Sequence, residues 1–439
     1  MLSARENIRS EAPSWDSALK PMSSRHGDIK TRLLLHLRFS AIRDREDRIT
    51  KAMTDTFEWI YHEQVLDVGR FAWNPFVGWL QSDVGLYWIA GKAGSGKSTL
   101  MKFLHSDPRT EEHLRVWARD SRLIITGHFF WNSGNAIQMS VEGLIRTLLH
   151  DIGTQLPNML PNLFPGRWAE MESNLDPMLM VLQPWTTSEC LQAFRRILSH
   201  LFNHFRFIIF VDGLDECSGD HEELTTLLKE MAASSNIKMC LASRPWSVFQ
   251  DAFNSSPSLM LQHLTSGDIC VFVHTKFYEH RGFLELEKGD RKLAAQLCDD
   301  ITEKASGVFL WVRLAVQSLL RGIANGDRVI DLTRRLEDLP EDLEMLFCKI
   351  LDSVDPAYRV HSAQLFQIHR TASECEDGIS LLRFSYADDD DQALWDDEGR
   401  PLGRDEFVYR VKSMDRRLDS RTKGLLETTT SFIDEIEDR

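Results

Sequence analysis

The sequence predicts a three-layer α/β domain with a parallel sheet, followed by an all-helical region. Short apolar runs, which are typical of buried strands, lie at 84–90, 123–131, 207–211 and 237–242. Helical patterns lie between them, after a possible N-cap at Ser140 over 144–152 and again over 191–205. Strands that alternate with helices predict a parallel sheet covered on both faces. Beyond residue 264 only helical patterns recur, at 269–277, 292–323 and 343–354.

A length of 439 residues leaves room for roughly two to four domains, and these patterns suggest their limits. A mobile lead at 1–30, rich in Ser, Arg and Glu, is expected to carry no chemistry. A short helical pre-domain at 31–82 precedes the α/β domain at 83–265. A small helical domain is expected at 266–337, and a last region at 338–439.

The charge of the chain disfavours some classes of partner. With 51 basic and 66 acidic residues the net charge is -15, which repels nucleic-acid phosphates and acidic membranes. We therefore expect no nucleic acid among the partners. Much of the acidic excess lies near 388–398, which we interpret as a solvated loop.

The chain is expected in the cytoplasm. Its seven cysteines are an odd number without CxxC spacing, as in proteins that keep reduced thiols. The first thirty residues lack the apolar stretch of a secretory signal. No apolar run approaches the ~20 residues that a membrane helix needs. The most apolar stretch, at 309–323, carries Arg313, Gln317 and Arg321 as one polar stripe.

A glycine-rich motif follows the first predicted strand. The run from 91 to 98 satisfies G-x-x-x-x-G-K-[ST], a Walker A or P-loop pattern that arises by chance on the order of once in a hundred such chains. Glycines let backbone N–H groups surround a phosphate, Lys97 would reach the β- and γ-phosphates, and Ser98 would ligate Mg²⁺. The motif predicts binding of ATP or GTP with Mg²⁺. The expected nucleotide-binding residues are Gly91, Lys92, Ala93, Gly94, Ser95, Gly96, Lys97, Ser98 and Thr99.

Polar residues follow two further predicted strands, where α/β sheets place their ligands. Asp212 ends an apolar run as a Walker B acid does, and we expect it to hold Mg²⁺ together with Ser98. Asp215 and Glu216 are the candidates to orient or deprotonate the attacking water, and the pattern does not choose between them. After the next strand, Ser243 and Arg244 are expected to face the γ-phosphate as sensors.

The series of motifs resembles the NACHT family of signal-transduction NTPases, specifically its fungal NLR-like branch with a nephrocystin-type N-terminal domain. The motifs that carry this resemblance are Leu-Arg-Phe at 37–39, Thr-Phe-Glu-Trp-Ile at 56–60, Trp-Ile-Ala before the P-loop at 88–90, Phe-Phe-Trp-Asn-Ser-Gly at 129–134, Phe-Val-Asp-Gly-Leu-Asp-Glu at 210–216, Ala-Ser-Arg-Pro at 242–245, Leu-Thr at 264–265 with Asp-Ile at 268–269, Gly-Val-Phe-Leu-Trp-Val at 307–312 and Arg-Leu-Asp-Ser-Arg-Thr-Lys-Gly-Leu-Leu at 417–426.

The resemblance implies an α/β NTPase core, a small helical domain and a winged-helix-like domain, with the nucleotide at their junction. It implies a STAND-type switch of the innate-immunity or incompatibility kind, in which slow hydrolysis controls association with itself or with related NLR-like proteins. Gly307-Val308-Phe309 stands where many relatives carry Gly-x-Pro. His361 and His369 are the candidates for a winged-helix histidine at the β-phosphate.

Two other functions fit the motifs. One is a nucleotide-binding scaffold without turnover, and the other is a metabolic P-loop ATPase or kinase, for which a substrate pocket and an arginine-bearing lid are not evident. About thirty residues precede the first family motif, and no sensor repeats follow the last one. We therefore expect an incomplete gene model, a natural short form or an adaptor that works through a fuller partner.

Overall fold

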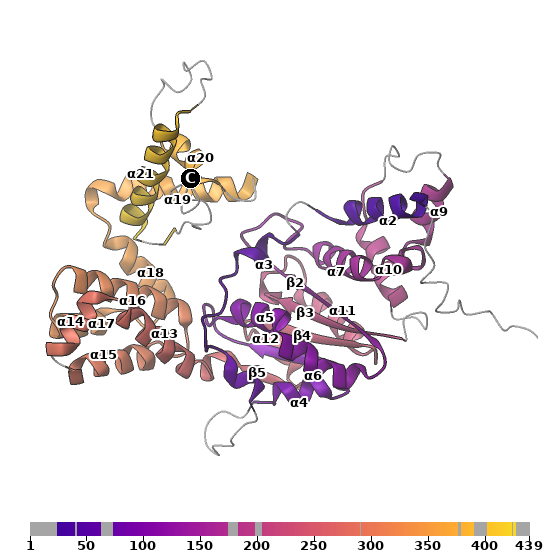
Figure 1. The fold of residues 1–439 in the computed structure, drawn as a ribbon, viewed down its shortest axis with the longest axis horizontal. Helices are drawn as coiled ribbons and strands as arrows, with labels where there is room; N and C mark the ends of the chain where they lie inside the picture. The colour runs from indigo at the N-terminus through magenta and orange to yellow at the C-terminus, as the bar shows by residue number, and fades with distance from the viewer. Residues whose placement is uncertain are drawn as a thin grey trace, which may run out of the picture.

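The computed structural model describes residues 24–39, 42–62, 73–173, 183–197, 204–289, 291–375, 379–389, 402–423 and 425–426. Figure 1 shows an α/β part that contains the sheet, beside a group of helices from α13 to α17, with α19 to α21 grouped at the end of the chain. The predicted fold class, an α/β core followed by helices, is confirmed.

The sheet has five parallel strands in the order β2-β3-β4-β1-β5. Four of them lie at the predicted apolar runs: β1 (Leu86–Ala90), β2 (Arg122–Phe129), β3 (Phe205–Asp212) and β4 (Ile237–Ser243). The edge strand β5 (Ser258–Met260) was not predicted. It has only three residues, and two of them are half-buried, so it lacks the apolar run by which the others are recognised.

Alternate residues of the strands enter two separate cores, one on each face of the sheet. On one face, Trp88 and Ile209 pack with α7 (Val141–Gln155), α10 (Thr187–Ile197), α11 (His221–Ala232) and α12 (Ser247–Phe253). On the other face, Ile89 and Phe210 pack with α4 (Phe76–Gln81), α5 (Lys97–Ser106), α6 (Pro108–Ala118) and the turn η1 (Glu58–Tyr61). Both faces are therefore covered.

Ser140 caps α7 as predicted, since its Oγ accepts a hydrogen bond from the backbone N of Gly143 at 3.0 Å. The helix predicted over 191–205 was too long. Within the described residues α10 ends at Ile197, and Phe205 begins β3. Phe205 stands four residues after Leu201, which is a helical spacing, but it packs in the same core as Phe207 on one face of the sheet.

The expectation of a mobile lead was wrong for residues 24–30. They belong to α2 (Ser24–Leu37), whose residues Ile29, Leu33 and Leu37 are fully buried and share the core that contains α7. Their spacing of four places them on one face of the helix, which is how such a helix packs. The lead up to residue 23 lies outside the described residues.

The helical group that follows the sheet has a core of its own. It consists of α13 (Ser266–Tyr278), α14 (Arg281–Gly289), α15 (Arg291–Lys304), α16 (Phe309–Ala324) and α17 (Val329–Asp338). Trp311 lies fully buried in it, and its indole N–H donates to the carbonyl of Pro340 at 2.6 Å. We call this group the helical domain.

The last region contains α18 (Leu343–Asp352), α19 (Arg359–Cys375), α20 (Leu381–Ala387) and α21 (Arg404–Thr422). No strand occurs among its described residues, so the winged-helix assignment stays a prediction. The expectation of a solvated acidic loop was wrong for its first two residues. The Asp388 side chain is 2% exposed and pairs with His361 and Arg417, while Asp389 pairs with Arg410. These partners come from α19 and α21, which the acidic run itself does not reveal. Residues 390–398 of the predicted loop lie outside the described residues.

Among the helices of the described ranges, none has both the length and the apolar character that crossing a membrane requires.

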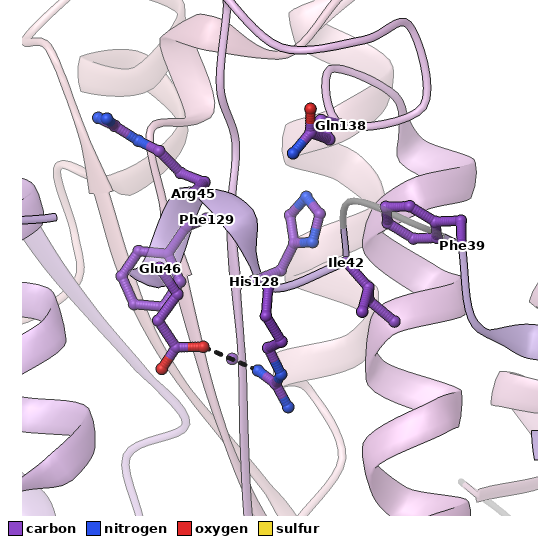
Figure 2. Close-up of a pocket in the computed structure, with 9 residues that line it drawn as sticks. Phe39, Ile42, Arg45, Glu46, His128, Phe129 and Gln138 are labelled. Atoms are coloured by element: carbon purple, nitrogen blue, oxygen red, sulfur yellow. Dashed lines mark hydrogen bonds and ion pairs between the residues drawn. The ribbon is translucent and has the colours of Figure 1, made fainter. Parts of the chain in front are cut away.

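A short helix, α3 (Asp44–Arg48), is attached to the sheet by polar contacts. Arg43 donates to Asp151 of α7 at 2.5 Å, and the second carboxylate oxygen of Asp151 accepts from Thr126 of β2 at 2.8 Å. Figure 2 shows the neighbouring His128 of β2 in a small pocket lined by residues of α3 and by Gln138. The Thr147 hydroxyl donates to the Gly143 carbonyl at 2.7 Å, so His128 Nδ1, 3.1 Å away, is the donor to Thr147.

We predict that Leu33→Ala lowers the free energy of unfolding by about 2–5 kcal/mol, because it removes a fully buried side chain from a packed core. Leu35→Ala is the matched control on the same helix, since Leu35 is 57% exposed and its loss is expected to change stability by less than about 0.5 kcal/mol. Urea unfolding of both variants measures the difference, and equal effects would show that α2 is not docked.

We predict that His128 makes the fold sensitive to acid. Burial lowers its pKa from 6.5 to about 3, so the folded protein disfavours the imidazolium that the unfolded chain forms near pH 6.5. The stability that His128 provides is full above pH 6.5 and is lost as pH falls toward 3, by up to roughly 5 kcal/mol. Urea midpoints between pH 7.5 and 4 should fall more steeply for the wild type than for His128→Gln, and parallel curves would refute this.

Candidate nucleotide-binding site

The loop between β1 and α5 has the backbone conformation that the motif requires. Gly94 and Gly96 have φ angles of 69° and 94°, in the left-handed region that glycine adopts readily. Gly96 is the N-cap of α5 and has no side chain to cap the helix, so amide hydrogens of the first turn face the loop. This arrangement presents backbone donors and the positive end of the helix to an anion.

Lys97 folds back onto its own loop. Its ammonium donates to the carbonyl oxygens of Gly91 at 2.8 Å and Lys92 at 3.0 Å. Burial lowers the pKa of Lys97, and the carboxylates of Asp215 and Asp212 oppose that shift. The ammonium is therefore held in the loop, close to the acids at the end of β3.

Asp212 lies at the carboxyl end of β3 and is 1% exposed. Its Oδ1 is buried and has no hydrogen-bond partner, while the Ser98 side chain hydrogen-bonds to the carboxylate. Burial raises the pKa of Asp212 to about 6, and the bond from Ser98 opposes the shift. A buried carboxylate oxygen without a partner, beside a hydroxyl, fits the oxygen ligands that Mg²⁺ prefers.

The described residues contain no cluster of three or more His, Cys, Asp or Glu side chains that could hold a metal by themselves. A Mg²⁺ ion at Asp212 and Ser98 would therefore complete its shell with phosphate oxygens and water, as is usual for Mg²⁺ in nucleotide sites.

Both candidate catalytic acids already have partners. They lie in the turn η4 (Leu214–Glu216), which follows Gly213 with a φ of 73°. The Asp215 carboxylate accepts from the backbone N of Arg244 at 2.9 Å and forms an ion pair with its Nε at 3.0 Å. Glu216 Oε2 accepts from the backbone N of Asn132 at 2.9 Å.

The two candidate sensors behave differently. Arg244 lines the cavity described below, whereas Ser243 is fully buried in β4. The Ser243 hydroxyl accepts from the Trp88 indole at 2.9 Å and donates to the Arg244 carbonyl at 3.0 Å. Ser243 therefore joins neighbouring strands, and its side chain does not line the cavity.

A cavity of about 590 Å³ surrounds the loop, within the usual range for a small-molecule site. The α/β domain contributes residues 93–99, Asp212, Gly213, Asp215, Glu216 and Arg244. The segment before β1 contributes Arg45, Thr50, Lys51, Ala52, Met53, Thr56 and Phe57, and the helical domain contributes Phe272, Lys276, Phe309, Leu310 and Arg313. Its basic side chains outnumber the acidic ones although the chain as a whole is acidic, which favours a polyphosphate ligand.

Sequence reasoning gave no role to the residues that the segment before β1 and the helical domain bring to this cavity. Thr56, Phe57, Phe309 and Leu310 stand in motifs of the family resemblance, which was the available signal for four of them. His361 and His369 do not line the cavity.

The helical domain binds directly to the loop. The backbone N of Leu310 donates to the Gly94 carbonyl at 3.0 Å, and a Cβ on Gly94 would lie 2.8 Å from that of Leu310. Gly307 has a φ of 78°, and a Cβ there would lie 2.0 Å from the Gln262 carbonyl oxygen. Gln262 in turn accepts from the backbone N of Lys92 at 3.3 Å. Glycines at both positions permit this close approach.

Asp268 of α13 ties the segment before β1 to the helical domain. Its carboxylate is 4% exposed and accepts from the backbone N of Phe57 at 3.0 Å and from the indole of Trp59 at 2.8 Å. Phe57 has a φ of 64°, in the left-handed region that is uncommon for such a residue. The α/β domain, the segment before β1 and the helical domain therefore meet around the cavity.

Comparisons with known proteins bear on this site. Residues 70–244 match the protein family described as Nephrocystin 3, N-terminal, and residues 353–438 match a domain of unknown function (DUF7791). The vegetative incompatibility protein HET-E-1 of Podospora anserina is 21% identical over 278 residues, which cover 62% of this chain. The chain spans 19% of the length of HET-E-1.

Two solved structures share a weaker likeness. Cdc6p from Pyrobaculum aerophilum is 11% identical with a TM-score of 0.34, covering 81% of this chain and 84% of its own. Drosophila ORC bound to DNA is 13% identical with a TM-score of 0.32, covering 82% of this chain and 91% of its own. TM-scores this low do not establish a common fold, so the architecture rests on the strand order given above.

The match over 70–244 includes β1, the glycine-rich loop, Asp212 and Arg244. Together with the similarity to HET-E-1, it supports the resemblance of this part of the chain to NACHT-type NTPases of the NLR-like kind.

Proposed function

We propose that this chain is a nucleotide-operated signalling switch, in which slow Mg²⁺-dependent hydrolysis of ATP or GTP controls association with itself or with related NLR-like proteins in the cytoplasm. The observation that carries the proposal is the unpartnered Oδ1 of Asp212 beside Ser98. It lies in a basic cavity that the helical domain closes by binding the phosphate loop.

The roles of the loop residues follow from their positions. The backbone of residues 91–96 and the first turn of α5 would surround the β-phosphate. Lys97 would exchange the carbonyls of Gly91 and Lys92 for phosphate oxygens. Ser98 and Asp212 would hold Mg²⁺, which neutralises charge on the phosphates when it is bound.

Slow turnover is supported by the partners of the two acids. Asp215 would have to leave Arg244, or Glu216 the backbone N of Asn132, before either could accept a proton from water. A general base has to reach the proton that it abstracts, so each occupied carboxylate delays the reaction.

Switching is supported by the contact between the loop and the helical domain. Gly94 belongs to the phosphate loop, and its carbonyl also accepts the hydrogen bond from Leu310. A ligand that shifts the loop therefore changes a domain contact, and a ligand moves an equilibrium only through such a difference between two states.

The occupied acids also favour a second candidate, a nucleotide-binding scaffold without turnover. The two functions differ in measurable ways. Purified protein is loaded with labelled ATP or GTP, and the rate of hydrolysis is measured. The mass of the protein is then measured by light scattering, once with triphosphate and once with diphosphate. A switch hydrolyses slowly and changes mass with the nucleotide, whereas a scaffold does neither.

We predict that Lys97→Ala weakens nucleotide binding at least about tenfold, since charged hydrogen bonds to phosphate contribute roughly 1.5–3 kcal/mol. Lys92→Ala is the matched control, because only the backbone of Lys92 is assigned to the phosphate and its exposed side chain does not line the cavity. Calorimetric titration with Mg-ATP and Mg-GTP measures both variants. Unaltered affinity in Lys97→Ala would refute the assignment of the phosphate loop.

We predict that Gly307→Ala weakens the docking of the helical domain, because the added Cβ meets backbone at the Gln262 carbonyl. Gly326→Ala is the control, since Gly326 has a similar φ of 84° and open space around it. The control should lose about 1–2 kcal/mol of stability from its backbone angle, and Gly307→Ala should lose at least about 1 kcal/mol more.

Calorimetric unfolding compares the two glycine variants, and light scattering with diphosphate follows association. We propose that docking of the helical domain restrains association, so Gly307→Ala should show the larger mass. Equal stability and equal mass for the two variants would contradict the proposed restraint.

A further inference from the structure

We propose that Arg45 of α3 is part of the nucleotide site and binds the terminal phosphate of a triphosphate. The inference rests on the proposed function and adds to it a residue from the segment that precedes the α/β domain. Arg45 would make the site prefer a triphosphate over a diphosphate.

The first support is the position of Arg45. Its side chain lines the cavity together with Lys97, Ser98 and Asp212. Its Nε is buried and has no hydrogen-bond partner. No ion pair with Arg45 is found among the residues that the structure describes. Figure 2 shows Arg45 directed away from Glu46, the next residue of the same helix. A guanidinium in such a place fits an anionic ligand.

The second support is the way α3 is held against the helix of the phosphate loop. Lys102 of α5 donates to the carbonyl oxygens of Glu46 at 2.5 Å and Ile49 at 2.8 Å. The Glu46 carboxylate lies 3.2 Å from His105 of α5, and it also pairs with Arg43. These contacts fix the backbone of Arg45 relative to the loop, so its side chain reaches the cavity from a rigid base.

The third support is the charge at Asp212. Arg45 and the buried carboxylate of Asp212 line the same cavity. Asp212 is the expected Mg²⁺ ligand, and once a cation binds there the charge of Arg45 needs another anion. The terminal phosphate is the anion that a triphosphate brings to the metal and a diphosphate lacks.

Arginine suits this role better than lysine would. Its planar guanidinium can donate two parallel hydrogen bonds to phosphate oxygens, and it keeps its charge at all relevant pH values. Arg45→Lys should therefore retain part of the preference for triphosphate, whereas Arg45→Gln should lose it.

The test measures binding of a non-hydrolysable triphosphate analogue and of the diphosphate, each with Mg²⁺, to the full chain by calorimetry. We expect Arg45→Gln to lose at least about tenfold in affinity for the triphosphate and less than about twofold for the diphosphate. Arg48→Gln, which removes the same charge from the exposed side of the same helix, should bind both as the wild type does.

The ratio of the two affinities distinguishes a lost contact with phosphate from a damaged fold, because damage to the fold lowers the affinity for both ligands. Equal losses for triphosphate and diphosphate in Arg45→Gln, or no loss for either, would overturn the role of Arg45 while leaving the proposed function intact. Absence of binding by the wild type would overturn the proposed function itself.

Discussion

The hydrogen bond from Leu310 to the Gly94 carbonyl is the contact on which the organisation of this protein depends. It joins the phosphate loop to the first turn of α16, and it requires two backbones to approach so closely that Gly94 and Gly307 have no room for a side chain. The helical domain contributes to the lining of the cavity beside this contact. The proposed nucleotide site and the position of the helical domain therefore depend on one small group of atoms.

Much of the α/β domain could be predicted because buried parallel strands appear as uninterrupted apolar runs. Asp212 was recognisable for the same reason, as the acid at the end of such a run. β5 was not predicted because its three residues at the edge of the sheet form no apolar run. Ile29 was missed because the first residues of α2, 24–30, were assigned to the polar lead.

The contacts and cavity residues that could not be predicted come from segments that lie far apart in the sequence. Arg45 lies 46 positions before Gly91, and nothing in the sequence around it distinguishes it from an ordinary surface arginine. Asp388 looked like part of a solvated run, because its partners on α19 and α21 are brought together only by folding. The motif at 56–60 was visible as a family resemblance, but its bond to Asp268 depends on tertiary structure.

The bonds of Lys97 to its own loop have a consequence for selectivity. Any phosphate that Lys97 binds has to replace the carbonyls of Gly91 and Lys92, so that contact adds only the difference between two sets of hydrogen bonds. These two carbonyl oxygens compete equally with every nucleotide. Discrimination between ligands then depends on groups that give up no partner, and Asp212 Oδ1 and Arg45 Nε are two such groups in the cavity.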